Sequence, residues 1–374
     1  MKYYIIAGEV SGDLHAANLM KQLSALDAQA DFRCWGGDRM QAQGGVLVKH
    51  IDELAFMGFW EVLVNLRTIL SNLRQCKDDL LAFGPDVLIL IDYPGFNLRM
   101  AQFARQQGIR VVYYISPQIW AWKQSRIKKI RRDVDKMMVI LPFEQAFYRK
   151  FDVEVDFPGH PLLDALQEDT LGLHQKDFIH DNHLPEKPLV ALLPGSRRQE
   201  VTKMLHLMVA MAPRFPDVHF VIAGLTGLGK EIYGQFSAQD NVSVVFDQTY
   251  SLLMHARAAL VTSGTATLET ALFEVPQAVC YKANVVTYHI ARWLAKVKYI
   301  SLVNLIMDRQ VVRELIQHDL NEMELAKELE RLLHDSHYRG VMNQDYVLLK
   351  QKLGGAGASE NAARIIHEFL QTDD

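Results

Sequence analysis

The sequence is poor in cysteine and lacks the usual signatures of a metal site. Only 3 of its 374 residues are cysteine, namely Cys34, Cys76 and Cys280, and no two of them form a Cys-x-x-Cys pair. An odd and scattered set of this kind suggests neither a disulfide framework nor a zinc site, and it favours a reducing cytoplasm. Because the histidines form no His-Glu-x-x-His motif either, a metal hydrolase of that class has no support.

Long apolar runs and an excess of charge are missing as well. No apolar run approaches the roughly 18 residues that a membrane span needs, and the apolar residues before Gly8 are too few for the core of a signal peptide. The formal net charge is −4, and 22% of the residues are charged. This balance predicts a soluble globular protein of the cytoplasm and gives no sign of a nucleic-acid partner.

Short apolar runs alternate with segments of helical period along most of the chain, which predicts an α/β protein. Runs without polar alternation are typical of parallel strands covered on both faces, joined by helices. In the first half they are Tyr3 to Gly8, Phe32 to Trp35, Val46 to His50, Val87 to Ile91, Arg110 to Ile115 and Lys136 to Ile140. In the second half they are Leu189 to Leu193, Val218 to Gly224, Val242 to Phe246, Ala259 to Ser263 and Ala278 to Tyr281.

Because the βα pattern restarts after Pro188, we expect two Rossmann-like domains, each a doubly wound parallel sheet, that face a central cleft. The predicted boundaries are residues 1–165 for the first domain and 166–355 for the second. The last residues, 356–374, are predicted to form a helical tail that crosses back onto the first domain.

Two strands of the first domain end in residues that could carry chemistry. After the first strand come Glu9, Ser11, Gly12 and Asp13, which either line a ligand cleft or simply cap the next helix, and the two readings have about equal support. After the fourth predicted strand comes Asp92. A carboxylate left in a core without a partner costs several kcal/mol, so this one is expected either at the exposed end of its strand or in an ion pair.

Two strands of the second domain run into helix starts suited to anions. The first turn contains Gly195, Ser196 and Arg197, where free backbone N–H groups and a guanidinium would bind a phosphate, although a structural turn with a surface arginine is the alternative. The second, which contains Ser263, Gly264 and Thr265, would bind a second phosphate.

One turn into the helix that follows, the carboxylate of Glu269 could accept both hydroxyls of a ribose. A surface glutamate on an amphipathic helix is an equally good reading of this residue by itself.

Taken in order, these turns resemble those of the lipid A disaccharide synthase family, bacterial inverting glycosyltransferases with the two-domain GT-B architecture. The resemblance rests on the motifs GEVSGD, IDYPGFN, ISPQIWAWK, GHPLLD, LLPGSR, SGTATLE and ISLVN, which span most of the chain. Ala16 and Val303 depart from the family pattern, where glycine and proline are expected.

The resemblance implies a hexosyltransferase of lipid A and lipopolysaccharide synthesis in Gram-negative bacteria. Such an enzyme moves the sugar of UDP-2,3-diacylglucosamine to 2,3-diacylglucosamine 1-phosphate, forms a β-1,6-linked disaccharide and releases UDP. Asp92 matches the family's candidate base, and Asn304 lies where a family motif lines the donor site. Ser196, Arg197 and the helix start at Ser263 would stabilise the departing UDP, so no metal or other cofactor is expected.

Substrates with acyl chains imply contact with a membrane surface, here the inner membrane as a peripheral enzyme. Two stretches are candidates, although ordinary packing explains either of them about as well. The first contains Phe56, Met57, Phe59 and Trp60 and could form an interfacial wedge. The second contains Trp120 and Trp122 followed by a lysine- and arginine-rich segment that suits an anionic leaflet. A homodimer is compatible with all of these features.

Two other functions use the same features. A UDP-sugar 2-epimerase would have the same two domains but no acceptor lipid. A non-enzymatic nucleotide-sugar-binding protein would retain its ligand without turnover, and it ranks third because exported binding proteins of this shape carry a signal peptide.

Overall fold

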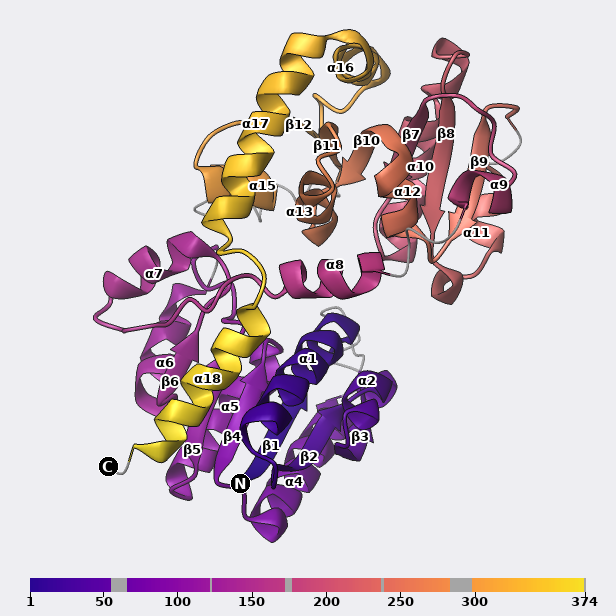
Figure 1. Ribbon diagram of the computed structural model, residues 1–374. Helices are drawn as coiled ribbons and strands as arrows, with labels where there is room; N and C mark the ends of the chain where they lie inside the picture. Colours follow the sequence, from indigo (N-terminus) through magenta and orange to yellow (C-terminus); the bar gives the residue numbers. More distant parts are fainter. Residues whose placement is uncertain (55–65, 122, 172–176, 237–238, 283–297, 373–374) are drawn as a thin grey trace. The chain divides into compact units, whose positions relative to one another are not determined.

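The computed structural model describes residues 1–54, 66–121, 123–171, 177–236, 239–282 and 298–372, and it divides into two compact units (Figure 1). Unit 1 comprises residues 1–167 and 353–374, and unit 2 comprises residues 168–352. The sequence placed the boundaries after residues 165 and 355. Each unit is an α/β domain with a doubly wound parallel sheet, which confirms the predicted fold class.

Unit 1 contains a six-stranded parallel sheet in the order β3-β2-β1-β4-β5-β6. Its strands are β1 (Lys2–Ala7), β2 (Asp31–Gly36), β3 (Val46–His50), β4 (Val87–Ile91), β5 (Arg110–Tyr114) and β6 (Lys136–Met138). Its helices are α1 (Val10–Leu26), α2 (Asp38–Ala42), α4 (Leu66–Phe83), α5 (Pro94–Gln106), α6 (Ile127–Asp133), α7 (Pro142–Arg149), α8 (Leu162–Leu171, which runs into unit 2) and α18 (Ala358–Gln371). Short 3-10 turns cover Ile51–Glu53 and Gln124–Arg126.

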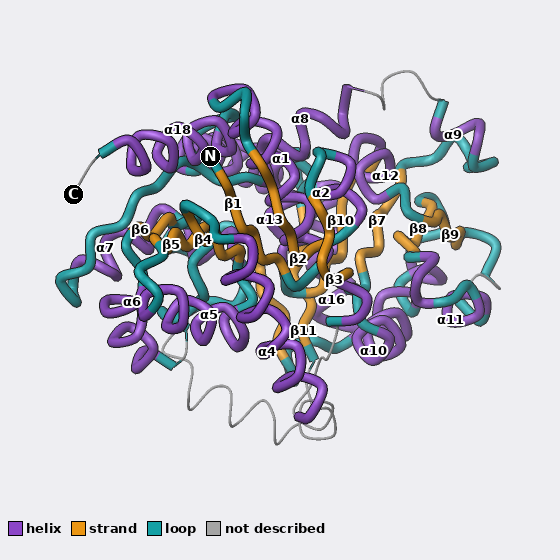
Figure 2. Tube along the Cα trace, turned by 90° about the horizontal axis from the view of Figure 1, so that it is seen from below, coloured by secondary structure: helices purple, strands orange, loops and turns teal. Residues whose placement is uncertain are grey.

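Helices cover both faces of this sheet, which is why its strands read as continuous apolar runs (Figure 2). On one face Tyr3 and Ile5 pack in a core with α1 and α18. On the other face Tyr4 and Ile6 pack in a core with α4, α5 and α6. Strand β4 lies between β1 and β5 and is buried along its whole length. Its C-terminal end is therefore held firmly where the carboxyl ends of the strands meet.

The C-terminal helix α18 belongs to unit 1 and lies beside α1. The carboxylate of Asp164 caps its first turn, accepting hydrogen bonds from the backbone N–H groups of Gly357 (2.6 Å), Ala358 (3.2 Å) and Ser359 (2.7 Å). A carboxylate at a helix N-terminus both satisfies free donors and complements the helix dipole. The tail is therefore an integral layer of unit 1.

Unit 2 repeats the topology of unit 1, with the strand order β12-β11-β10-β7-β8-β9. Its strands are β7 (Leu189–Leu193), β8 (His219–Gly224), β9 (Val242–Phe246), β10 (Ala256–Thr262), β11 (Gln277–Tyr281) and β12 (Arg313–Ile316). Its helices are α9 (Phe178–Asp181), α10 (Arg198–Val209), α11 (Glu231–Gly234), α12 (Thr249–His255), α13 (Thr265–Leu272), α15 (Leu302–Met307), α16 (Glu322–His334) and α17 (Ser336–Lys352). Short 3-10 turns cover Ala212–Arg214 and Thr226–Leu228.

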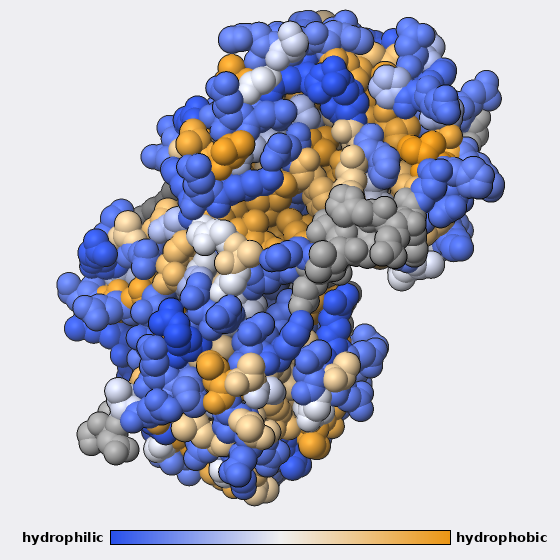
Figure 3. All heavy atoms as spheres, in the orientation of Figure 1, coloured by the Kyte–Doolittle hydropathy of each residue, from blue (hydrophilic) through white to orange (hydrophobic). Residues whose placement is uncertain are grey.

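The surface matches the composition of the chain. Hydrophilic residues cover most of the face shown in Figure 3, with apolar residues among them. Within the part of the chain that the structure describes, no helix is both long enough and apolar enough to cross a bilayer.

Candidate functional site

Each sheet has one point where the strand order reverses direction, and ligands of open α/β sheets bind outside the carboxyl ends of the strands at such a point. In unit 1 this point lies between β1 and β4, and in unit 2 it lies between β7 and β10. The loops that follow these strands contain the residues singled out from the sequence. Topology therefore brings them together in two groups, one in each unit.

In unit 2 the loops after β7 and β10 form a cavity of about 250 Å³. Its lining residues are Leu193, Pro194, Gly195, Ser196, Glu200, Ala223, Leu225, Thr249, Thr262, Ser263, Gly264, Thr265, Ala266 and Glu269. Six of the predicted donor-site residues, Gly195, Ser196, Ser263, Gly264, Thr265 and Glu269, thus line a single pocket.

Two helices begin at this pocket, and neither has a side-chain cap. The N-cap residues Arg197 of α10 and Gly264 of α13 make no side-chain hydrogen bond to their helices. The first N–H groups of each helix therefore remain available, and together with the positive ends of the helix dipoles they make the pocket suitable for an anion. Gly195 adopts a positive φ of 108°, which lets the chain turn sharply out of β7 into α10.

Two polar side chains of the pocket have no partner among the described residues. Thr262 is 5% exposed, and its Oγ1 is buried without a hydrogen bond. Burial raises the pKa of the Glu269 carboxyl to about 7. Buried polar groups normally pair, so these two groups suit a polar ligand in the pocket.

Two predicted donor-site residues lie outside the pocket lining. The Arg197 side chain is 67% exposed and pairs with Glu200 at 3.3 Å; exposed pairs of this kind are weak, so the guanidinium can exchange partners. Asn304 is fully buried. Its Oδ1 accepts from the N–H groups of Val311 (2.7 Å) and Val312 (3.0 Å), and its Nδ2 donates to the Val312 carbonyl (2.9 Å) and Glu314 (2.9 Å). All four of its hydrogen-bonding positions are therefore used inside unit 2, and its donor contact stays a prediction.

In unit 1, Asp92 directly follows β4 and is exposed to solvent. Asp92 and Tyr93 both adopt left-handed conformations, with φ of 43° and 47°. L-residues adopt this region at a cost of roughly 1–2 kcal/mol each, and such strain persists only where the surrounding structure enforces it.

The backbone carbonyl of Asp92 is the anchor of this turn. It accepts hydrogen bonds from the Tyr113 hydroxyl (2.5 Å) and the Asn97 Nδ2 (2.8 Å). Asn97 is fully buried and also donates to the Ile91 carbonyl at 3.1 Å. Residues of β5 and α5 therefore fix the backbone from which the Asp92 carboxylate projects.

The Asp92 carboxyl has a raised pKa. Although solvent reaches its side chain, nearby protein displaces much of its hydration, and the negative charge of Glu9 adds to this effect. Together they raise the pKa of Asp92 to about 6. A carboxylate of this kind is ionised at neutral pH and is a stronger base than an ordinary aspartate.

The loop after β1 contains two exposed residues and two residues that hold the fold of unit 1 together. Glu9 and Ser11 are exposed, and Glu9 is the neighbour that acts on Asp92. Gly12 packs against β1: a Cβ there would lie 3.3 Å from the Cβ of Ala7. Asp13 is 4% exposed and caps α2, accepting from the N–H groups of Gly37 (2.7 Å), Met40 (3.1 Å) and Arg39 (3.2 Å). In the structure its carboxylate thus anchors a neighbouring loop.

Most of the predicted lipid contacts lie outside the described residues; these are Phe56, Met57, Phe59, Trp60 and Trp122. Trp120 is half-buried. Its Nε1 donates to the buried Glu144 (3.1 Å), and its ring packs edge-on against Phe143 with the centroids 5.0 Å apart. These contacts tie Trp120 into unit 1.

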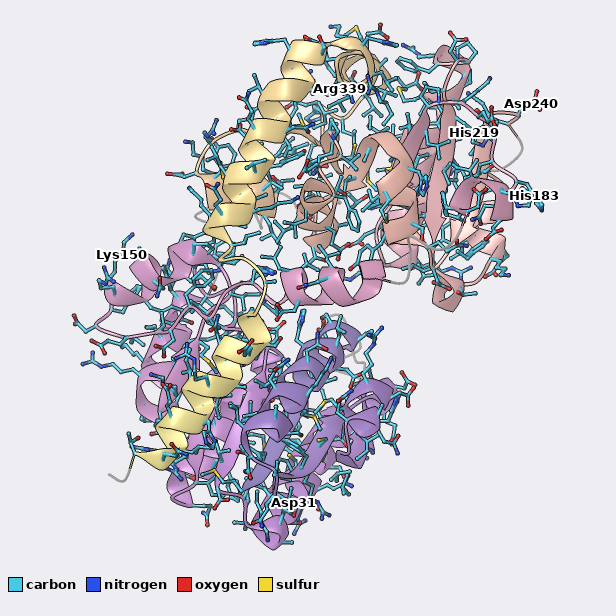
Figure 4. The ribbon with its side chains drawn as sticks, in the orientation of Figure 1. Asp31, Lys150, His183, His219, Asp240 and Arg339 are labelled. Carbon is cyan, nitrogen blue, oxygen red and sulfur yellow. The ribbon has the colours of Figure 1, made fainter. Side chains whose placement is uncertain are left out.

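Unit 2 has a larger hollow, of about 450 Å³, at the other edge of its sheet. It is lined by residues that include His219 and Asp240 (Figure 4). His219 begins β8, and Asp240 precedes β9, so this hollow lies at the amino ends of the strands. Because ligands of such sheets bind at the carboxyl ends, the smaller pocket is the better candidate.

Comparisons with known proteins show which family this chain belongs to. The family model described as "Lipid-A-disaccharide synthetase" matches residues 3–366. A lipid-A-disaccharide synthase of Geobacter sulfurreducens is 37% identical, over 98% of this chain and 96% of that protein. One of Coxiella burnetii is also 37% identical, over 98% of each chain. This chain belongs to the lipid-A-disaccharide synthase family. It is therefore an enzyme of the glycosyltransferase class, as the resemblance predicted.

Solved structures with the same fold are more distant in sequence. The Staphylococcus aureus MnaA–UDP structure has a TM-score of 0.72 at 13% identity and covers 99% of this chain and 96% of that chain. The glycotransferase of kitacinnamycin has a TM-score of 0.67 at 15% identity and covers 99% of each chain. At 13–15% identity these likenesses show the fold of this chain alone.

Sequence reasoning missed Thr262, Thr249 and Glu200 in the pocket lining. Thr262 could have been found, because it directly precedes Ser263 at the end of a strand. Thr249 lies at the start of α12, after a third strand of the sheet, and no local pattern marks it.

We predict that Gly8→Ala disturbs the Asp92 turn. A Cβ at Gly8 would lie 2.4 Å from Cγ of the Tyr93 ring, so the ring and the turn must shift. Overpacking of this kind costs about 1–3 kcal/mol, and the displaced turn should lower kcat. Thermal unfolding and steady-state kinetics measure the two effects.

Gly95→Ala is the matched control, because a Cβ there would meet nothing within 4 Å. Equal behaviour of the two variants would show that the Tyr93 ring does not fix this turn.

Proposed function

We propose that this enzyme transfers the sugar of UDP-2,3-diacylglucosamine to the 6-hydroxyl of 2,3-diacylglucosamine 1-phosphate, with inversion, to give the β-1,6-linked lipid A disaccharide precursor and UDP. The observation that carries the proposal is the pocket of unit 2, where two uncapped helix N-termini face one cavity. Membership of the family supplies the substrate class.

Asp92 is the base in this proposal. Its carboxylate takes the proton of the acceptor 6-hydroxyl while the hydroxyl oxygen attacks the anomeric carbon and the bond from that carbon to the UDP oxygen breaks. The raised pKa of Asp92, its exposure and its fixed backbone all suit proton transfer. Positioned bases of this kind contribute about 10²- to 10⁴-fold in rate.

The diphosphate of UDP binds at the helix ends of unit 2. The N–H groups that begin α10 and α13 donate to its oxygens, and Arg197 joins them when the diphosphate competes with Glu200 for its guanidinium. Donors fixed in advance stabilise the charge that develops on the departing UDP. Glu269 and Thr262, which have no other partner among the described residues, bind hydroxyl groups of the nucleotide-sugar.

These donors make a metal ion unnecessary for UDP to leave. Within the described residues, no three His, Cys, Asp or Glu side chains come together as a metal site requires. Metal independence nevertheless rests on the proposed role of the helix ends and stays a prediction.

The enzyme meets its lipid substrates at an anionic membrane surface in this proposal. Helix α6 buries Ile127 and Ile130 and exposes a set of basic residues, Lys128, Lys129, Arg131 and Arg132. Lys150, at the end of α7, is exposed as well (Figure 4). Each cation near an anionic leaflet contributes about 1 kcal/mol of binding. Assembly into a homodimer stays a prediction without further support.

A 2-epimerase is the second candidate, because several solved structures of UDP-GlcNAc 2-epimerases share the fold. Those likenesses are at 12–14% identity and concern the fold alone, whereas the relatives at 37% identity over 98% of the chain are synthases.

Mass analysis of products tests the reaction directly. We expect UDP and a disaccharide phosphate from the two diacylglucosamine substrates, and equal activity in a chelator. Interconversion of UDP-GlcNAc alone to its manno epimer would favour the epimerase, and UDP-sugar retained without turnover would favour a binding protein.

We predict that Asp92→Asn lowers kcat by about two to four orders of magnitude, because an amide cannot take the proton. UDP affinity should stay unchanged. Asp152→Asn is the matched control, since Asp152 also has a positive φ, of 53°, and asparagine adopts that conformation equally well. Near-normal turnover of Asp92→Asn would remove this residue from the base role.

The pH profile of kcat should follow the ionisation of Asp92. Because the base works only when ionised and its pKa is about 6, kcat should fall as the pH drops through 6. Glu9→Gln removes a negative charge that raises this pKa, so the acid limb should move to lower pH. An acid limb that stays in place in Glu9→Gln would assign the titration to another group.

Arg197→Ala should raise the Kd for UDP about tenfold, as the loss of one hydrogen bond to a charged group does. Arg198→Ala is its control. Arg198 is the next residue, its side chain is 65% exposed, and it pairs with Glu231. Calorimetric titration with UDP compares the two, and equal affinities in both variants would place the Arg197 guanidinium away from the diphosphate.

A further inference from the structure

The carboxylate of Glu314, on strand β12, accepts hydrogen bonds from three residues of one segment of unit 2. Its Oε1 accepts from the Ser301 N–H (2.9 Å), the Ser301 hydroxyl (2.9 Å) and the Asn304 Nδ2 (2.9 Å), and its Oε2 accepts from the Ile300 N–H (3.0 Å). Hydrogen bonds to an ionised acceptor are roughly twice as strong as neutral ones. One side chain thus holds the whole segment from residue 300 to residue 304.

This segment starts helix α15. Ser301 is its N-cap, and the Ser301 hydroxyl accepts from the Asn304 N–H at 3.3 Å. Ser301 and Asn304 are both fully buried. Without Glu314 their polar groups would lose their main acceptor in a place that water does not reach, which costs about 1–3 kcal/mol for each group left unpaired.

The same segment holds one wall of the nucleotide pocket. The carbonyl of Ile300 accepts from the Ser263 hydroxyl at 3.1 Å, and Ser263 lines the pocket next to Gly264 and Thr265. Helix α15 packs against α13, which starts at that wall (Figure 1). A continuous chain of contacts therefore runs from Glu314 through Ile300 to Ser263.

We propose that Glu314 is a positioning residue for the donor site: it fixes Ile300, whose carbonyl orients Ser263 and with it the N-terminus of α13 that receives the diphosphate. Glu314 itself does not line the pocket. The inference rests on the proposed binding of UDP in this pocket, and it assigns a role to a residue that lies outside both the pocket lining and the turns after β7 and β10.

Glu314→Gln tests the inference, because glutamine keeps the shape but loses the charge and one acceptor. We expect the Kd for UDP to rise about five- to thirtyfold, as for one or two weakened hydrogen bonds to a charged group. The KM for the acceptor and kcat at saturating donor should change by less than about twofold, since UDP binding alone is disturbed. A purely structural role would lower the unfolding temperature and leave the Kd of the folded protein unchanged.

Glu324→Gln is the matched control. Glu324 pairs with Arg313, the neighbour of Glu314 in β12, at 2.5 Å. Its other partners among the described residues are Lys327 and Asn321, and none of the three belongs to the 300–304 segment. Its loss should leave the Kd for UDP unchanged. If Glu314→Gln and Glu324→Gln bind UDP equally well, and both are folded by circular dichroism, the inference is overturned.

A double-mutant cycle tests the route through Ser263. Ser263→Ala should weaken UDP binding, and Glu314→Gln added to it should weaken binding by less than about twofold more, because both changes break the same chain. Fully additive effects would overturn the route through Ser263. Wild-type protein that fails to bind UDP at all would instead contradict the proposed donor site, so the two failures are distinguishable.

Discussion

Two hydrogen bonds to one carbonyl oxygen, that of Asp92, hold the turn from which the proposed base projects. Asp92 and Tyr93 both take left-handed conformations, which an isolated chain would leave. Tyr113 and Asn97, from β5 and α5, compensate for this cost with bonds that form only in the folded sheet. The carboxylate therefore projects from a backbone that the neighbouring strand and helix keep in place.

Unit 2 differs from unit 1, because its pocket leaves backbone N–H donors at two helix starts without side-chain partners. The side chains of Ser301 and Asn321 cap the first turns of helices α15 and α16. At the pocket, α10 and α13 have no such caps, and free N–H groups at a helix start are costly unless water or a ligand meets them. The same topology thus gives a carboxylate on a fixed backbone after β4 of unit 1 and uncapped helix starts after β7 and β10 of unit 2.

The sequence was sufficient for the strands from β1 to β11 and for the loops that follow them, because buried parallel strands leave an unbroken apolar run. The sequence was insufficient wherever a side chain forms its hydrogen bonds or ion pairs with an element far away along the chain. Asp13 was expected at its own turn, and it caps α2 instead. Strand β12 was missed because it has four residues and two of them, Arg313 and Glu314, are charged. The partners of those charges lie in other elements, so periodicity cannot reveal them.

In the proposed reaction, the raised pKa of Asp92 links the fold to the rate of proton transfer. An aspartate with an ordinary pKa is ionised at neutral pH but is a weak base. Raising the pKa to about 6 increases its proton affinity roughly a hundredfold and still leaves most of it ionised at neutral pH. A much more buried carboxylate would be protonated, and a fully hydrated one would bind the proton too weakly. The turn after β4 places Asp92 between these limits, because nearby protein and the charge of Glu9 raise its pKa while the residue stays exposed to solvent.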